Sequence, residues 1–161
     1  MKQKFIPFKI LSKKEKIEIE NKLNKQFGIK EIPGILLRRG AERIFLFQGS
    51  FTKKDIKELE YNIPTERVGI YFAKIIGNYI RLSIEGIHAL KDQINKNIFD
   101  LNEQQAEQWM TGEELLIETG KRDFLIMRYK EDFLGCGKAS EKKIGNYVPK
   151  SRRLKNKNII V

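Results

Sequence analysis

The motif GCGK, at Gly135–Lys138, is the stretch of this sequence closest to a phosphate-binding loop. A Walker loop has the pattern G-x-x-x-x-G-K-[ST], and GCGK lacks both that length and the final hydroxyl residue. No G-x-G-x-x-G pattern occurs either, so nothing indicates a dinucleotide or S-adenosylmethionine site. We therefore expect no cofactor.

A few other side chains could support catalysis. Cys136 is the only cysteine and His88 the only histidine. Because a reactive cysteine needs a lowered pKa, we interpret Cys136 as a buried, inert strand residue, and His88 as a structural or surface residue. Glu113–Glu114 could act as paired acids, although a solvated pair is more common. We do not expect this protein to be an enzyme. The alternative is a small RNA-modifying enzyme that uses these residues or Asp92.

Metal binding is also not expected. A structural zinc site usually takes four Cys or His ligands, and the chain has one of each.

The strongest functional signal lies in Leu134–Val161, which holds eight Lys and Arg against one acidic residue, Glu141. Tyr147 could stack on an RNA base, and the Asn146 amide could hydrogen-bond to one. Glycines at 135, 137 and 145 could let a phosphate approach main-chain N–H groups. The predicted RNA-binding residues are Lys138, Lys142, Lys143, Asn146, Tyr147, Lys150, Arg152 and Arg153.

A second basic cluster is formed by Arg38, Arg39 and Arg43 around a predicted hairpin turn. It could be a further RNA-binding patch. Ordinary solvated charge at a turn explains it equally well, so both interpretations stay open.

The distribution of charge also points to a polyanion. The net charge is +11. Residues 1–60 carry 15 Lys and Arg against 8 Asp and Glu, residues 61–120 carry 5 against 9, and residues 121–161 carry 12 against 4. Two basic ends around an acidic middle favour nucleic acid first and an anionic membrane second. Genome composition or a thermophilic surface would explain the high number of lysines, but it explains less well why the net charge changes sign along the chain.

Composition predicts a folded protein of the cytoplasm. Forty per cent of the residues are hydrophobic, with ten Phe, which is enough for a core. The start, MKQKFIPFKILSKK, is interrupted too early by Lys and Pro to be a secretion signal. No apolar run is long enough to span a bilayer, so we expect no membrane partner.

The elements of the N-terminal part follow from caps and turns. FIPFKIL predicts an edge strand, because Pro7 cannot donate a ladder hydrogen bond. SKKE, from Ser12, is a capping box for a helix that Gly28 ends. GILLRRGAERIFLFQG predicts a hairpin, and a short helix capped by Thr52 should follow, with Ile63–Pro64 ending it.

The remaining elements form a second group. RVGIYFAKIIGNYIRLSI predicts a hairpin that turns at Gly77–Asn78, and a helical segment over 84–94 follows. DLNEQQAEQWM predicts a capped helix that ends at Thr111–Gly112. FLIMRY and FLGCGKA predict two strands joined by KED. The polar stretch KDQINKN is the expected domain boundary.

Three phrases in the last fifty residues carry a family resemblance: GEEL at Gly112–Leu115, LGCGK at Leu134–Lys138 and NYVPK at Asn146–Lys150. They resemble the PUA domain, a small RNA-binding pseudo-barrel, in the form that ends RNA cytosine-5 methyltransferases of the Nol/Nop/Sun type, including RsmF-like enzymes. The order of elements over the whole chain is similar to the two-domain Nip-type ribosome-biogenesis factors.

The resemblance implies an α+β fold: an N-terminal small α/β (pre-PUA) domain at 1–93 and a C-terminal PUA-like mixed β pseudo-barrel at 94–161. It implies binding of structured rRNA or tRNA, in RNA modification, rRNA processing or ribosome biogenesis, with pre-ribosomal proteins as further partners. The chain has no room for the catalytic domain of the methyltransferases. We therefore keep as an alternative an RNA-targeting subunit that works in trans with a separate RNA cytosine-5 methyltransferase.

Overall fold

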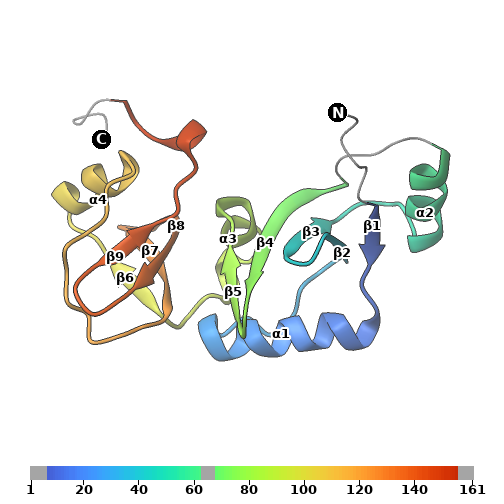
Figure 1. Ribbon diagram of the computed structural model, residues 1–161, viewed down its shortest axis with the longest axis horizontal. Helices are drawn as coiled ribbons and strands as arrows, with labels where there is room; N and C mark the ends of the chain where they lie inside the picture. The colour runs from blue at the N-terminus through green and yellow to red at the C-terminus, as the bar shows by residue number, and fades with distance from the viewer. Residues whose placement is uncertain (1–6, 63–67, 156–161) are drawn as a thin grey trace.

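The computed structural model describes residues 7–62 and 68–155. It is a mixed α/β structure with two β-sheets, each carrying its own helices (Figure 1). The first sheet belongs to the N-terminal part of the chain and the second to the C-terminal part. None of the helices in the described ranges is long and apolar enough to cross a membrane.

The first sheet is an antiparallel meander whose strands follow one another in sequence order. The strands are β1 (Phe8–Ile10), β2 (Ile35–Arg39), β3 (Arg43–Phe47), β4 (Ile70–Ile76) and β5 (Tyr79–Leu82). β1 lies at the edge of the sheet, as Pro7 predicted. Both predicted hairpins are confirmed, β2–β3 and β4–β5.

Two helices cover opposite faces of this sheet: α1 (Lys13–Phe27) and α2 (Lys53–Asn62). Leu23 of α1 is fully buried in one core cluster with Ile44, whereas Ile56 of α2 is buried in another with Phe45. Because successive strand residues point to opposite faces, Ile44 faces α1 and Phe45 faces α2. The two helices therefore pack on opposite faces of the sheet.

The predicted helix caps are confirmed. Glu15 N–H donates to Ser12 Oγ at 3.2 Å, and Ser12 N–H donates to the Glu15 carboxylate at 2.8 Å. Gly28 ends α1 in the left-handed region with φ of 81°. Thr52 and Asp55 cap α2 in the same reciprocal way, at 2.8 and 3.2 Å. The predicted end of α2 at Ile63–Pro64 lies outside the described residues.

The second sheet combines two predicted strands with two that were not predicted. β7 (Phe124–Tyr129) and β8 (Asp132–Ala139) form the expected hairpin. β6 (Ile98–Asp100) pairs parallel to β7, and β9 (Ile144–Asn146) pairs antiparallel to β8. α4 (Glu103–Met110) begins at an Asn102 cap and ends before Thr111, as expected.

The two sheets share one hydrophobic core. α3 (Ile84–Ala89) and η1 (Lys91–Gln93) form the predicted helical segment and connect the sheets. One cluster contains Leu23 and Ile87 together with Phe124 and Cys136 of the second sheet. A mixed α/β fold is therefore confirmed, while the pre-PUA assignment and a division between residues 93 and 94 stay predictions.

Candidate nucleic-acid interface

The predicted RNA-binding residues lie on β8, on the turn that leads to β9, on β9 and on the segment that follows, which includes the short helix η2 (Lys150–Arg152). They fall into two groups. Some are held by contacts within the protein, and others project into solvent without a side-chain partner in the described ranges.

Lys138 is the most constrained of the predicted cations. Its Nζ donates a hydrogen bond to the main-chain oxygen of Arg122. The same atom lies 4.8 Å from the centroid of the Tyr79 ring and 4.7 Å from that of Phe124, so it makes cation–π contacts with both. Lys138 therefore links β8 to β5 and β7 as well as adding positive charge.

Tyr147 is 41% exposed and lies between the two sheets. The Arg81 guanidinium of β5 lies 4.4 Å from the centroid of its ring, and the Phe124 ring is 6.1 Å away, centroid to centroid. Phe124 in turn contacts Tyr79, with centroids 6.3 Å apart. We call Tyr79, Arg81, Phe124, Lys138 and Tyr147 the aromatic–cation cluster.

Asn146 is held by the main chain. Its amide nitrogen donates to the oxygens of Trp109 and Glu113 at 2.8 and 2.9 Å, and its Oδ1 accepts from Val148 N–H at 2.8 Å. These bonds tie β9 to the end of α4. Both N–H donors of the amide are used, so a base that accepts from Asn146 would have to replace one of these bonds, whereas Oδ1 still has a second lone pair. The contact between Asn146 and a base stays a prediction.

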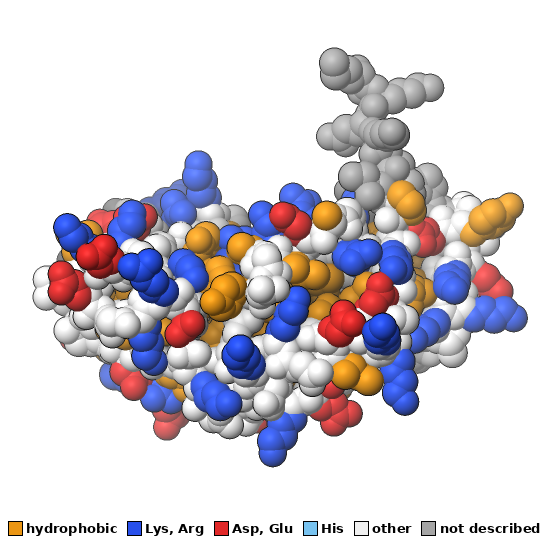
Figure 2. All heavy atoms as spheres, turned by 60° about the horizontal axis from the view of Figure 1, so that its bottom comes forward, with side chains coloured by type: hydrophobic (Ala, Val, Ile, Leu, Met, Phe, Trp, Pro, Cys, Tyr) orange, Lys and Arg blue, Asp and Glu red, His pale blue; other side chains and the backbone are white. Residues whose placement is uncertain are grey.

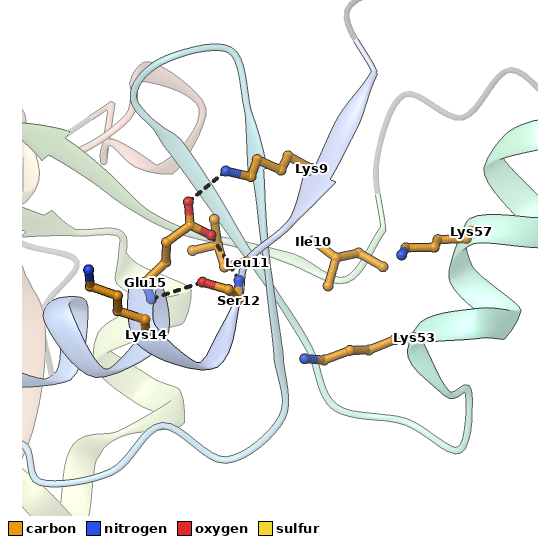
Figure 3. Close-up of a pocket in the computed structure, with 8 residues that line it drawn as sticks. All are labelled: Lys9, Ile10, Leu11, Ser12, Lys14, Glu15, Lys53 and Lys57. Carbon is orange, nitrogen blue, oxygen red and sulfur yellow. Dashed lines mark hydrogen bonds and ion pairs between the residues drawn. The ribbon is translucent and has the colours of Figure 1, made fainter.

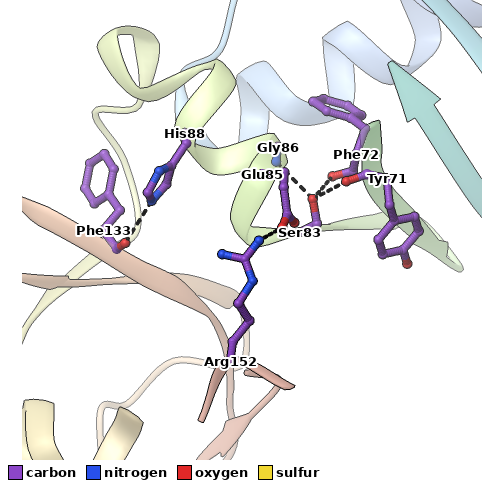
Figure 4. A network of polar contacts seen from close by, with 8 residues as sticks. All are labelled: Tyr71, Phe72, Ser83, Glu85, Gly86, His88, Phe133 and Arg152. Atoms are coloured by element: carbon purple, nitrogen blue, oxygen red, sulfur yellow. Dashed lines mark hydrogen bonds and ion pairs between the residues drawn. The ribbon is translucent and has the colours of Figure 1, made fainter. Parts of the chain in front are cut away.

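Arg152 and Arg153 also have partners within the protein. Arg152 forms an ion pair with Glu85 of α3, which joins the C-terminal segment to the connecting helix (Figure 4). Arg153 Nε donates to the Val148 oxygen at 3.0 Å, and its side chain crosses Gly112, whose φ is 92°. Both arginines therefore position the segment around η2.

His88 contributes to the same junction. Its Nε2 lies 3.3 Å from the Phe133 main-chain oxygen (Figure 4), which is a link between α3 and β8. This contact suits a structural histidine.

The remaining predicted cations are more open. Lys143 forms an exposed ion pair with Glu114 at 2.9 Å. Lys142 and Lys150 are exposed, and within the described ranges neither has a side-chain partner. They are available to a phosphate without breaking any contact.

Two of the glycines expected to admit a phosphate are instead packed inside the protein. Gly135 and Gly137 are buried. A Cβ at Gly137 would lie 2.6 Å from Ile144 Cγ2 and 2.9 Å from Trp109 Cη2. Gly137 is therefore explained by the close packing of α4 and β9 against β8. The expectation of open main-chain amides at these two positions was wrong.

A hollow of about 890 Å³ lies beside the aromatic–cation cluster. It is lined by Tyr79, Arg122, Lys138, Ala139, Ser140, Glu141, Lys142 and Lys143. Tyr79, Arg81 and Arg122 were not predicted as site residues. Tyr79 and Arg81 belong to another sheet, and only the fold brings them to β8; Arg122 could have been noticed as a basic residue just before β7.

The residues of the second predicted basic patch, Arg38, Arg39 and Arg43, lie on different faces of the first sheet. Arg39 and Arg43 are directly paired across β2 and β3, while Arg38 pairs with the buried Ile44. Because paired residues share a face and neighbouring residues alternate, Arg38 points to the other side from Arg39 and Arg43. Arg39 also lies over the Phe8 ring, 5.6 Å from its centroid.

Another basic hollow, of about 500 Å³, lies between β1, the start of α1 and α2 (Figure 3). Lys9, Lys14, Lys53 and Lys57 line it. Lys9 is paired with Glu15 at 2.6 Å, whereas within the described ranges the other three have no side-chain partner. This concentration of lysine was not identified from the sequence.

Figure 2 shows one face of the molecule, with Lys and Arg spread over its width, Asp and Glu interspersed among them, and hydrophobic side chains reaching the surface near the middle.

Two of the catalytic candidates, Cys136 and Glu114, are buried or paired. Cys136 is buried, and burial raises the pKa of its thiol to about 12. Glu114 is occupied by Lys143. Within residues 7–62 and 68–155, no three His, Cys, Asp or Glu side chains are grouped so that they could hold a metal ion.

Comparison with known proteins identifies the C-terminal part of the chain. No curated protein matches the sequence. Residues 96–154 match the family model of the methyltransferase RsmF PUA domain. This match covers β6 to η2 and all eight predicted RNA-binding residues, and it supports RNA binding in an RNA-modification context. The resemblance to the PUA domains of RsmF-type methyltransferases is thus confirmed for this segment.

Proposed function

We propose that this protein binds structured rRNA or tRNA and acts in RNA modification, rRNA processing or ribosome biogenesis without a catalytic site of its own. The observation that carries the proposal is a set of exposed cations on the segment that matches the PUA model, which have no side-chain partner within residues 7–62 and 68–155. These cations are Lys142, Lys150 and Arg122, which lies just before β7.

The state of the other candidate residues supports a binding role. A thiol with a pKa of about 12 is protonated at neutral pH and is a poor nucleophile. The predicted arginines are positioned by ion pairs and main-chain bonds, which orders the basic segment before RNA arrives. A preordered surface loses less conformational entropy on binding.

The test is the triple variant Arg122→Ala/Lys142→Ala/Lys150→Ala. Each phosphate neutralised contributes roughly 0.7–0.9 to the slope of log affinity against log salt. We expect the variant to bind rRNA or tRNA fragments more weakly, with a salt slope flatter by about 2.1–2.7 for three lost contacts. The matched control, Lys22→Ala/Lys25→Ala/Lys54→Ala, removes the same charge from α1 and α2.

The proposal fails if the first triple variant stays folded and keeps the affinity and salt slope of the wild type. A variant of Lys150, Arg152 and Arg153 is a less selective test. Arg152 and Arg153 also hold the fold together, so weaker binding could follow from a displaced segment.

A second candidate function is favoured by the kind of protein whose PUA domain matches. Residues 96–154 match a domain of a methyltransferase, so the protein could deliver RNA to a separate RNA cytosine-5 methyltransferase. Co-expression with such an enzyme, followed by co-purification and a methylation assay with and without this protein, tests it. An unchanged methylation rate and no stable complex would exclude it.

A further inference from the structure

Four cations form a row across the first sheet. The register pairs Arg39 with Arg43, Arg43 with Lys74, and Lys74 with Arg81. Directly paired residues of antiparallel strands project on the same face. The side chains of these four residues, which we call the cationic row, therefore project from one face of β2, β3, β4 and β5.

Like charges lie directly opposite each other in this row, which is a destabilising arrangement in a sheet. Lys74 forms an ion pair with Glu42 at 3.3 Å, and both side chains are substantially exposed to solvent. A screened surface pair contributes little, so Lys74 and the exposed Arg43 remain available to an anionic partner.

The cationic row ends in the aromatic–cation cluster. Arg81 is its last member and also lies over Tyr147 of the second sheet. Tyr79 precedes Arg81 by two residues on β5 and so projects on the same face. Tyr79 is 42% exposed and lines the hollow beside Lys138 and Arg122. A continuous surface thus runs from Arg39 to β8.

The dimensions and chemistry of this surface select the partner. With neighbouring strands about 4.8 Å apart, the row from β2 to β5 extends about 14 Å, which is long enough for several successive phosphates. A ring such as Tyr79 can only stack on a base that is not already stacked within a duplex. The surface therefore fits a single strand better than a regular double helix.

We propose that a single-stranded segment of RNA lies across both sheets, with its phosphates along Arg43, Lys74 and Arg81 and an unstacked base on Tyr79. This inference rests on the proposed function. It extends the RNA-binding surface beyond residues 96–154, and it assigns to the first sheet the recognition of an unpaired stretch next to the structured RNA.

The experiment compares a labelled single strand of about 12 nucleotides, within the range of known single-strand sites, with the duplex of the same sequence. Tyr79→Ala should weaken binding of the single strand about 5- to 150-fold, the effect of losing one stacked base, and change duplex binding much less. Tyr79→Phe keeps the ring and should bind as the wild type does.

Arg43→Ala/Lys74→Ala removes two phosphate contacts. The salt slope for the single strand should fall by about 1.4, since each contact with a single strand contributes roughly 0.7. Lys22→Ala/Lys25→Ala is the matched control on α1, which covers the opposite face of the sheet, and its slope should not change. Thermal melts establish that every variant is folded.

The outcomes separate the two proposals. One outcome overturns this inference while the proposed function stands. In it the wild type binds RNA and the Arg122/Lys142/Lys150 variant binds RNA more weakly, but Tyr79→Ala and Arg43→Ala/Lys74→Ala bind RNA as the wild type does. Equal losses for single strand and duplex would also overturn it. If the wild type binds vesicles that contain phosphatidylserine but does not bind RNA, and Arg43→Ala/Lys74→Ala weakens the binding to vesicles, the partner is an anionic membrane and both proposals fail.

Discussion

The guanidinium of Arg81, on β5, lies 4.4 Å from the centroid of the Tyr147 ring, which follows β9. The two residues belong to different sheets and are far apart in sequence. Their contact joins the cationic row of the first sheet to the basic segment that matches the PUA model. It also holds an aromatic ring and a cation where both remain accessible to a ligand.

This contact should be measurable as a coupling between the two sheets. We expect Arg81→Ala and Tyr147→Ala to be non-additive in the free energy of unfolding, with an interaction energy of about 0.5–1 kcal/mol, as for a partly exposed cation–π pair. Urea unfolding of the wild type, both single variants and the double variant gives this value. Strict additivity would mean that the contact is not formed in solution.

Gly137 should tolerate no side chain. The added methyl group of Gly137→Ala would lie 2.6 Å from Ile144 Cγ2 and 2.9 Å from Trp109 Cη2, so we expect a loss of about 1–3 kcal/mol from overpacking. Gly145→Ala is the control, because there the nearest atom is the Lys138 oxygen at 3.7 Å. Equal stability of the two variants, measured by chemical denaturation, would contradict this packing.

Local signals in the sequence predicted most of the helices and hairpins. Ser12 with Glu15, Gly28 and Gly77–Asn78 act on their immediate neighbours, so their effect can be read without the fold. β6 escaped prediction because it has three residues. Its pairing depends on β7, where Arg128 donates to the Asp100 carboxylate at 2.6 and 3.0 Å.

The candidate site was predicted less completely, for a related reason. Charge and residue type identify Lys142 or Tyr147 directly. They do not reveal that the amide of Asn146 is bonded to Trp109 and Glu113, or that Tyr79 and Arg81 lie beside β8. Those relationships arise from pairing and packing between distant segments. The predicted site consequently included the C-terminal segment and a possible patch at Arg38, Arg39 and Arg43, but neither Tyr79 nor Arg81.

The thiol of Cys136 should be unreactive in the folded protein. Burial raises its pKa to about 12, so at pH 8 almost none is present as the thiolate that reacts with disulfide reagents. We expect one equivalent of a chromogenic thiol reagent to be consumed rapidly in guanidinium chloride and very slowly without it. Rapid reaction under native conditions would contradict the buried position.

The carboxylate of Glu15 should make part of the stability depend on pH. The Lys9 ammonium and the Ser12 N–H hydrogen-bond to this carboxylate and lower its pKa from 4.5 to about 2. A group whose pKa is lowered by folding stabilises the native state above its unfolded pKa. This contribution should therefore be complete above about pH 4.5 and should disappear as the pH falls towards 2.

Glu15→Gln isolates this charge, because a glutamine oxygen can still accept the Ser12 N–H bond. We expect the variant to be less stable than the wild type at pH 7, with the difference shrinking between pH 4.5 and pH 2. Glu18→Gln is the matched control on the same helix, since Glu18 has no side-chain partner in the described ranges. A difference between the Glu15 variant and the wild type that stays constant as the pH is lowered would show that the Lys9–Glu15 pair does not stabilise the start of α1.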